Sequence, residues 1–354
     1  MPDSRTPLSK SRHVHLFFAA LLVVGAVFFE RTVAAAPTAP EDPCADQAGW
    51  QRLSVPETPA WQGSQFGISA VVGSLERNGV LFAVGDLDAY TSDDCGHNWR
   101  PLQLTKDHLP GHPEIGDFRP RISGRALAIG RGDYIYVGGE FRLWVSPDGG
   151  TTWNHDVPVI GKPWSLAAAP SNPKIAYALT PTVRNSFFDA LSRTVDGGIT
   201  WQSKALDIMA GSLTVDPLDA NTLYLMSRDG FAWRVDGTTG TRVALALPES
   251  HVGYGTDTGV TALALSPDGS HLWAIVRPSL RLWLSRDRGI TWNLVLVPTG
   301  PQEAHRLTVS PFDPRRLFLL DRQSGLWTIQ INESGVGSPP RLDQGEDAAP
   351  AQLP

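Results

Sequence analysis

A short pattern that recurs four times constrains the fold of this chain more than any other feature. The pattern is Ser or Thr, any residue, Asp, any residue, Gly, any residue, Thr or Asn, and then Trp. The four copies, called the box turns below, are Ser92–Trp99, Ser146–Trp153, Thr194–Trp201 and Ser285–Trp292. A fifth segment, Val235–Gly240, keeps the Asp and Gly but lacks the Trp. Successive Asp residues are 40 to 54 residues apart, which indicates one structural unit per copy.

Each box turn has the chemistry of a tight connection between two strands. An Asp carboxylate can accept hydrogen bonds from the backbone N–H groups of its own turn, and Gly adopts a positive φ easily. The final Trp begins the next strand, where its ring can pack between sheets. The pattern therefore predicts hairpin joints whose defining pairs are Asp94 and Trp99, Asp148 and Trp153, Asp196 and Trp201, and Asp287 and Trp292.

A second element repeats in phase with the box turns. Two apolar strands joined by a Pro-containing turn recur four times, with turns at 170–173, 216–217, 266–269 and 310–314. Each unit then reads as four short antiparallel strands, which is typical of a β-propeller blade. We predict an all-β propeller of six four-stranded blades, with seven blades as the alternative. The predicted units are 66–105, 122–160, 164–206, 211–247, 259–298 and 304–331.

The last predicted unit has only three strands. Its missing strand is expected at the other end of the chain, because Trp50–Pro56 resembles Trp99–Leu104, the segment after the first box turn. An N-terminal strand that completed the C-terminal blade would close the ring and cover an exposed sheet edge. The predicted propeller domain is therefore 44–332, followed by a Gly-, Pro- and acid-rich tail at 333–354 that we expect to be disordered.

The N-terminus has the pattern of an export signal. Arg5, Lys10 and Arg12 precede the apolar run Leu16–Phe29, and small residues follow at 34–36. This run of 14 residues is shorter than the roughly 20 that span a bilayer, so it is typical of a cleavable signal peptide. Residues 1–36 are thus predicted to be a signal peptide or, alternatively, a retained N-terminal anchor. We expect the protein to be secreted or otherwise extracytoplasmic.

The chain contains two cysteines and a modest negative charge. Cys44 and Cys95 both follow the export signal, so in an oxidising compartment they are a plausible disulfide, with two free thiols as the alternative. The formal net charge is −6, and there is no basic block. This balance argues against a nucleic acid as the main partner.

The repeats resemble the BNR or Asp-box superfamily of propellers over nearly all of the predicted domain. The superfamily includes sialidases, xyloglucan-degrading hydrolases, sortilin-type receptor ectodomains and photosystem II assembly factors, so the motif indicates a fold and not one activity. The resemblance implies that the box turns lie at the periphery, opposite the functional face, and that their Asp residues are structural. Function is then expected on the other face, from loops that supply Glu140, Arg184, Arg228, Arg277, Arg322 and Tyr254, together with Asp88, Asp189, Asp321 and His305.

A sialidase-like enzyme would hold the substrate carboxylate with arginines and use a Tyr nucleophile, a Glu and an Asp acid/base. The residues that such an enzyme would use here are Arg184, Arg277, Arg322, Tyr254, Glu249 and Asp86. The family's Arg-Ile-Pro signature is absent, and Tyr254 is the last Tyr in the chain. Arg228-Asp229 and Asp321-Arg322 also have the pattern of self-paired hairpin tips.

The sequence therefore favours a non-catalytic binding protein or assembly scaffold, with an exo-α-sialidase type of glycosidase as the alternative. We expect a protein or glycan ligand on the loop face, no cofactor, no nucleic acid and a monomer. Contact with a membrane is expected only through an uncleaved N-terminal segment. A loop with His108, His112 and Glu114 offers ligand types for a metal, but its spacing matches no zinc signature, and we predict no metal site.

Overall fold

A computed structural model describes the part of the chain that carries the predicted blades. The described residues are 44, 49–56, 68–85, 88–104, 126–139, 143–157, 163–181, 189–248, 259–277, 280–301, 303–321 and 325–332. They all belong to the compact unit Asp42–Pro354. The predicted export signal (1–36) and the predicted disordered tail (333–354) lie outside the described residues.

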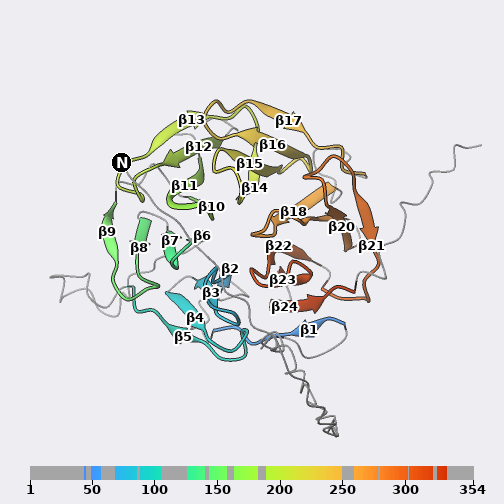
Figure 1. The fold of residues 1–354 in the computed structure, drawn as a ribbon, viewed down its shortest axis with the longest axis horizontal. Helices are drawn as coiled ribbons and strands as arrows, with labels where there is room; N and C mark the ends of the chain where they lie inside the picture. Colours follow the sequence, from blue (N-terminus) through green and yellow to red (C-terminus); the bar gives the residue numbers. More distant parts are fainter. Residues whose placement is uncertain are drawn as a thin grey trace, which may run out of the picture. The chain divides into compact units, whose positions relative to one another are not determined.

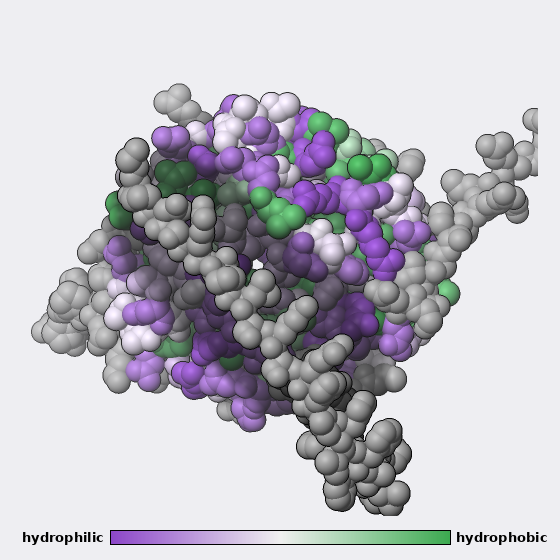
Figure 2. Space-filling model, viewed as in Figure 1, coloured by the Kyte–Doolittle hydropathy of each residue, from purple (hydrophilic) through white to green (hydrophobic). Residues whose placement is uncertain are grey.

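The described residues form six four-stranded antiparallel sheets and no helix. Figure 1 shows the sheets as blades around a central axis, with one strand of each blade near the axis and another at the rim. From the inside outward, the strands of each blade are called a, b, c and d. Figure 2 shows one face of this ring, whose surface is mostly hydrophilic with scattered hydrophobic side chains. The prediction of six blades is confirmed.

The strand bounds follow the predicted units closely. Blade 1 is β2 (Ile68–Gly73), β3 (Leu81–Gly85), β4 (Ala89–Ser92) and β5 (Arg100–Pro101), and blade 2 is β6 (Ala126–Gly130), β7 (Tyr134–Gly138), β8 (Leu143–Ser146) and β9 (Asn154–Val157). Blade 3 is β10 (Ser165–Ala169), β11 (Asn172–Pro181), β12 (Asp189–Thr194) and β13 (Gln202–Ala205), and blade 4 is β14 (Ala210–Val215), β15 (Thr222–Ser227), β16 (Ala232–Asp236) and β17 (Arg242–Ala244). Blade 5 is β18 (Gly259–Leu265), β19 (Leu272–Arg277), β20 (Arg281–Ser285) and β21 (Asn293–Val295). Blade 6 is β22 (Ala304–Val309), β23 (Arg316–Asp321), β24 (Gly325–Gln330) and β1 (Gln51–Arg52).

The N-terminal strand closes the ring as predicted. In β1, Gln51 pairs with Thr328 and Arg52 pairs with Trp327, so β1 is the outer strand of blade 6. The two cysteines form a disulfide with a Cα–Cα distance of 5.5 Å, which confirms the pairing of Cys44 with Cys95. The bridge joins the segment that leads into β1 to the box turn of blade 1.

The core lies between the blades. Buried apolar side chains form six clusters, and each cluster combines strands of two neighbouring blades. The Trp of every box turn packs at the boundary with the preceding blade. Trp99, Trp153 and Trp201 are partly buried there, and Trp292 is buried. The prediction that these rings pack between sheets is therefore confirmed.

Candidate functional site

The antiparallel order of the strands gives the ring two chemically different faces. The four box turns connect strands c and d of blades 1, 2, 3 and 5, so they lie on the same side as the a–b turns. This side is called the box face below. The b–c loops and the links between blades emerge on the opposite side, called the loop face. The structure thus disperses the box turns around the rim (Figure 1) and does not gather them around one cavity.

In each box turn, the Asp carboxylate is engaged within the turn itself. In the second box turn, Asp148 accepts hydrogen bonds from the Ser146 hydroxyl at 2.9 Å and from the backbone N–H and hydroxyl of Thr152 at 2.8 and 2.7 Å. The other three turns repeat the same set of contacts around Asp94, Asp196 and Asp287.

These contacts set the acidity of the box carboxylates. Partial desolvation alone would raise the pKa of Asp94, Asp148 and Asp287, but the hydrogen bonds together hold each pKa below its ordinary value. For Asp196, the Thr200 hydroxyl makes the largest contribution and the pKa is lowered to about 2. A carboxylate held in this way is a poor proton donor or acceptor near neutral pH, so these residues are structural joints.

Half of the twelve loop-face residues that the sequence analysis names lie outside the described residues. Arg277 ends strand β19 and its backbone pairs with Gly259, but its side chain is outside the description. Arg228 is described in full. The six that lie outside the described residues are Asp86, Glu140, Arg184, Glu249, Tyr254 and Arg322.

Arg228 lies in the b–c loop of blade 4 and contacts the neighbouring blade. Its guanidinium carbon is 4.7 Å from the centroid of the Trp164 ring, a cation–π contact, and its backbone N–H donates to the carbonyl of Met209. Asp229 instead accepts a hydrogen bond from the Ser227 hydroxyl. The expectation that Arg228 and Asp229 pair with each other is therefore wrong. The exposed arginine is held by an aromatic ring at the entrance to the central axis.

A second arginine crosses the central axis from blade 6. Arg306 on β22 donates a hydrogen bond through Nη2 to the carbonyl oxygen of Trp164, in the opposite blade, at 3.0 Å. A register shift between Ala304 and Arg306 places two consecutive half-buried residues, His305 and Arg306, on the inner strand. Sequence reasoning missed Arg306 because strict alternation along a strand does not anticipate a bulge.

The central cavity encloses about 190 Å³. It is lined mainly by small and aliphatic residues of the six inner strands, with Trp164, Ser165, His305 and Arg306 among the polar or aromatic members. The indole Nε1 of Trp164 is buried and has no hydrogen-bond partner among the described residues. The described part of the cavity is therefore a narrow, mostly apolar space along the axis, with Arg306 and Trp164 at its loop-face end.

Three loop-face carboxylates that the sequence analysis names as candidate site residues accept hydrogen bonds from backbone N–H groups. Asp88 accepts hydrogen bonds from the N–H groups of Gln103 and Leu104, and Asp189 accepts one from Ala210 at 2.7 Å. Asp321 is buried and accepts a hydrogen bond from the N–H of Glu303 at 2.6 Å. Burial raises the pKa of Asp88 and of Asp189, although their backbone contacts act in the opposite direction.

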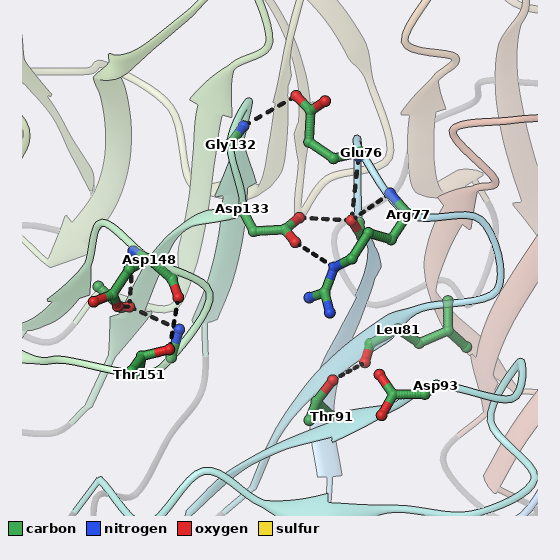
Figure 3. Close-up of polar contacts among 12 residues, drawn as sticks. Glu76, Arg77, Leu81, Thr91, Asp93, Gly132, Asp133, Asp148 and Thr151 are labelled. Carbon is green, nitrogen blue, oxygen red and sulfur yellow. Dashed lines mark hydrogen bonds and ion pairs between the residues drawn. The ribbon is translucent and has the colours of Figure 1, made fainter.

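A second cavity of about 500 Å³ lies on the box side between blades 1 and 2. Figure 3 shows Arg77 and Asp133 pointing toward each other across this boundary. Arg77 Nε is 2.8 Å from Asp133 Oδ2, and the Ser74 hydroxyl donates to Asp133 Oδ1 at 2.6 Å. Asp133 also has a φ of 52°, which is uncommon for a non-glycine residue although Asp tolerates it better than most. We interpret the pair as a bridge between blades.

Within the described ranges, no group of three or more His, Cys, Asp or Glu side chains could hold a metal ion. The loop with His108, His112 and Glu114 lies outside these ranges. No helix of the described chain is long and apolar enough to span a bilayer.

The fold and its two faces define the chain as a six-bladed β-propeller. Solved structures that share the fold include an ancestral GH74 enzyme, with a TM-score of 0.50 and 21% identity over 82% of this chain and 39% of that one. The GH74 xyloglucanase of Xanthomonas campestris has a TM-score of 0.51 and 15% identity over 80% of this chain and 54% of its own. The WD40 repeats of RRP9 have a TM-score of 0.52 and 11% identity over 80% and 98%.

The chain thus spans 39% to 54% of the two hydrolase chains. No family model and no curated protein sequence matches it. At these identities the likeness concerns the fold alone, which hydrolases and a WD40 repeat protein share.

Proposed function

We propose that this protein is an exported, non-catalytic propeller of the Asp-box type that binds a protein or glycan partner through its loop face. The proposal includes export by residues 1–36 and a monomeric state. A disulfide between the only two cysteines is consistent with an oxidising, extracytoplasmic location.

The observation that carries the proposal is the use of the carboxylates. The box Asp residues are engaged in their own turns, and Asp88, Asp189 and Asp321 accept hydrogen bonds from backbone N–H groups. Among the residues that the described loop face presents to solvent is the exposed Arg228, which lies over the half-buried Trp164. Arg and Trp are enriched where proteins bind partners.

The alternative is a sialidase-like glycosidase. It would need Arg184, Arg277 and Arg322 to converge with Tyr254, Glu249 and Asp86, and the side chains of these residues lie outside the description. Turnover of a fluorogenic sialoside or another glycoside, lost in Tyr254→Phe with the fold intact, would establish the glycosidase and refute the binding role.

The test of the binding role compares the two faces. The purified chain is screened on a glycan array and by affinity capture from its host, and the affinity for each ligand found is then measured by calorimetry. Arg228→Ala should weaken binding at least tenfold, about 1.4 kcal/mol. Arg131→Ala removes an arginine from the opposite face, where its side chain is 75% exposed, and should leave affinity unchanged. Equal affinity for Arg228→Ala and the wild type would contradict a binding site on the loop face at the entrance to the central cavity.

A further inference from the structure

The strand that closes the ring is held by a very short ladder. β1 contains two residues, whereas the other strands of blade 6 contain six each. Beyond the ladder, the N–H of Leu53 donates to the carbonyl of Leu326 at 2.9 Å, and the buried Leu53 side chain packs in the cluster between blades 6 and 1. A strand paired over so few residues would open easily if nothing else held it.

Side-chain contacts extend this hold to both neighbouring blades. Trp50 Nε1 donates to the carbonyl of Pro298 in the link that follows blade 5, at 2.9 Å. Ser54 donates through its hydroxyl to the carbonyl of Gly96 at 2.8 Å, and Trp99 Nε1 donates to the carbonyl of Ser54 at 3.1 Å. These contacts are partly exposed, so each contributes modestly. Besides the polypeptide backbone itself, the disulfide is the one covalent link between this segment and another blade among the described residues.

Cys95 occupies a position in its box turn where glycine would fit the backbone better. This indicates that the cysteine is present there in order to form the bridge. The residue between the Asp and the Gly of each turn has a left-handed backbone. It is glycine in two turns, with φ of 71° at Gly149 and 80° at Gly197, but Cys95 adopts 61°. A non-glycine residue in this region costs about 1–2 kcal/mol.

The same position faces the preceding blade in the fourth box turn. There Arg288 has a φ of 60°, and its Nη1 is 3.4 Å from Oδ2 of the buried Asp216 in blade 4. Both box turns that carry a side chain at this position therefore use it to join two blades. Arg288 makes an ion pair, whereas Cys95 makes a covalent bond that can be reduced.

The two sulfur atoms differ in access. Cys95 is 3% exposed, whereas Cys44 is half-buried. A dithiol reductant would therefore attack Cys44 Sγ through its thiolate, breaking the S–S bond and releasing Cys95 as a thiolate that takes up a proton. The second thiol of the reductant then displaces Cys44, leaving two cysteine thiols and one oxidised dithiol.

We propose that the Cys44–Cys95 bridge is a redox latch on the ring. Oxidised, it keeps β1 on β24 and closes blade 6. Reduced, it lets the segment 49–56 detach while the other blades stay folded, and β24 becomes an open sheet edge at the 6–1 boundary. The inference does not depend on what the loop face binds.

Hydrogen exchange of the full chain tests the latch. Peptides covering 49–56 and 325–332 should exchange at least tenfold faster in the dithiothreitol-reduced protein than in the oxidised protein. Peptides from blades 3 and 4 should keep their rates within twofold. Unchanged exchange at 49–56 would refute the proposal, and so would a rise shared by all six blades, since the bridge would then hold the whole fold.

Two variants separate the latch from the chemistry of the reductant. Cys95→Gly restores the residue type of the second and third box turns, so it removes the bridge without backbone strain and should exchange like the reduced wild type, with or without dithiothreitol. Arg288→Gly makes the same replacement at the 4–5 boundary and should leave 49–56 protected in the oxidised protein. Protection of 49–56 in Cys95→Gly equal to that of the oxidised wild type would contradict the proposal.

Discussion

In the first box turn, two adjacent aspartates have different surroundings. Asp94 accepts hydrogen bonds from the Ser92 hydroxyl and from the backbone and side-chain N–H groups of Asn98, all within one turn. Among the described residues, the one partner of Asp93 is Arg100, with which it makes an exposed ion pair. A residue type that often serves in catalysis is thus structural at one position and a surface charge at the next. The residues around each Asp determine which of these two roles it has.

Asp94→Asn should destabilise the protein by about 1–3 kcal/mol, because the amide cannot accept every hydrogen bond that the carboxylate accepts. Asp93→Asn, one residue away, should cost less than about 1 kcal/mol, as expected for an exposed pair. Urea unfolding of both variants measures the difference. Equal loss in the two variants would contradict the structural role assigned to Asp94.

The low pKa of Asp196 predicts a pH dependence with a definite sign. The folded pKa of about 2 lies below the ordinary 3.8, so the stabilisation is fully present above about pH 4 and is lost as the pH falls through 2. Thr200→Val removes the hydroxyl donor and should move the pKa of Asp196 upward. Carboxyl carbon NMR titration measures the midpoint. Ile199→Val, at an exposed neighbouring position, should leave it near 2.

At the residue scale, the sequence predicted the box turns and the disulfide. It did not predict the contacts of Arg228 and Arg306 with Trp164 at the entrance to the central cavity. The boxes are local, so eight consecutive residues contain their own hydrogen-bond partners. The contact between Arg306 and Trp164 joins residues 142 positions apart and depends on a bulge, which no local pattern encodes. The expectation that Arg228 and Asp229 pair with each other was wrong: Arg228 lies over Trp164 of the neighbouring blade, and Asp229 accepts a hydrogen bond from Ser227.

Between the blades, aromatic residues of strand b act as hydrogen-bond donors. The hydroxyl of Tyr136 donates to the carbonyl of Pro173 at 2.7 Å, that of Tyr177 to Ala220 at 2.8 Å, and Trp273 Nε1 to Pro314 at 2.9 Å. Each donor belongs to one blade and each acceptor to the next. Because the boundaries also contain the apolar clusters, a blade is stabilised mainly by its neighbours. The sequence predicted these strands but not the hydrogen-bond acceptors in the next blade, because those depend on how the blades pack.

Tyr177→Phe should therefore destabilise the protein by about 1 kcal/mol, since it leaves the carbonyl of Ala220 and the Nε of Arg193 without this partner. Tyr90→Phe is the matched control, because Tyr90 is also buried on a blade strand, β4, and its hydroxyl makes no hydrogen bond among the described residues. Its effect should stay within about 0.5 kcal/mol. Chemical unfolding distinguishes the two, and a larger loss in Tyr90→Phe would refute the role of the inter-blade bond.

For the whole molecule, the number of blades and the closure were predictable because the blade repeats along the chain. β1 is first in sequence but last in the order of strands from the axis outward in blade 6. The direction of the chain at this strand matches the d strands of the other blades. Which blade is completed by the N-terminal strand is therefore a property of the connectivity and not of the fold.

A circular permutant that begins at residue 57 and joins residue 332 to residue 49 through a short linker should consequently fold into the same six blades. The join would take the place of a box turn between β24 and β1. The permutant lacks Cys44 and therefore has no bridge. Its tryptophan fluorescence and thermal unfolding should consequently resemble those of the Cys95→Gly variant. Loss of cooperative unfolding in the permutant alone would show that closure requires the native break.

The hydrogen bond from Arg306 to Trp164 has a consequence for how such a ring can be used. The Arg306 side chain spans the axis from blade 6 to blade 3 near the end where both inner strands begin, on the loop face. A ligand that entered the axis from the loop face would therefore meet a guanidinium before it reached the aliphatic walls of the cavity.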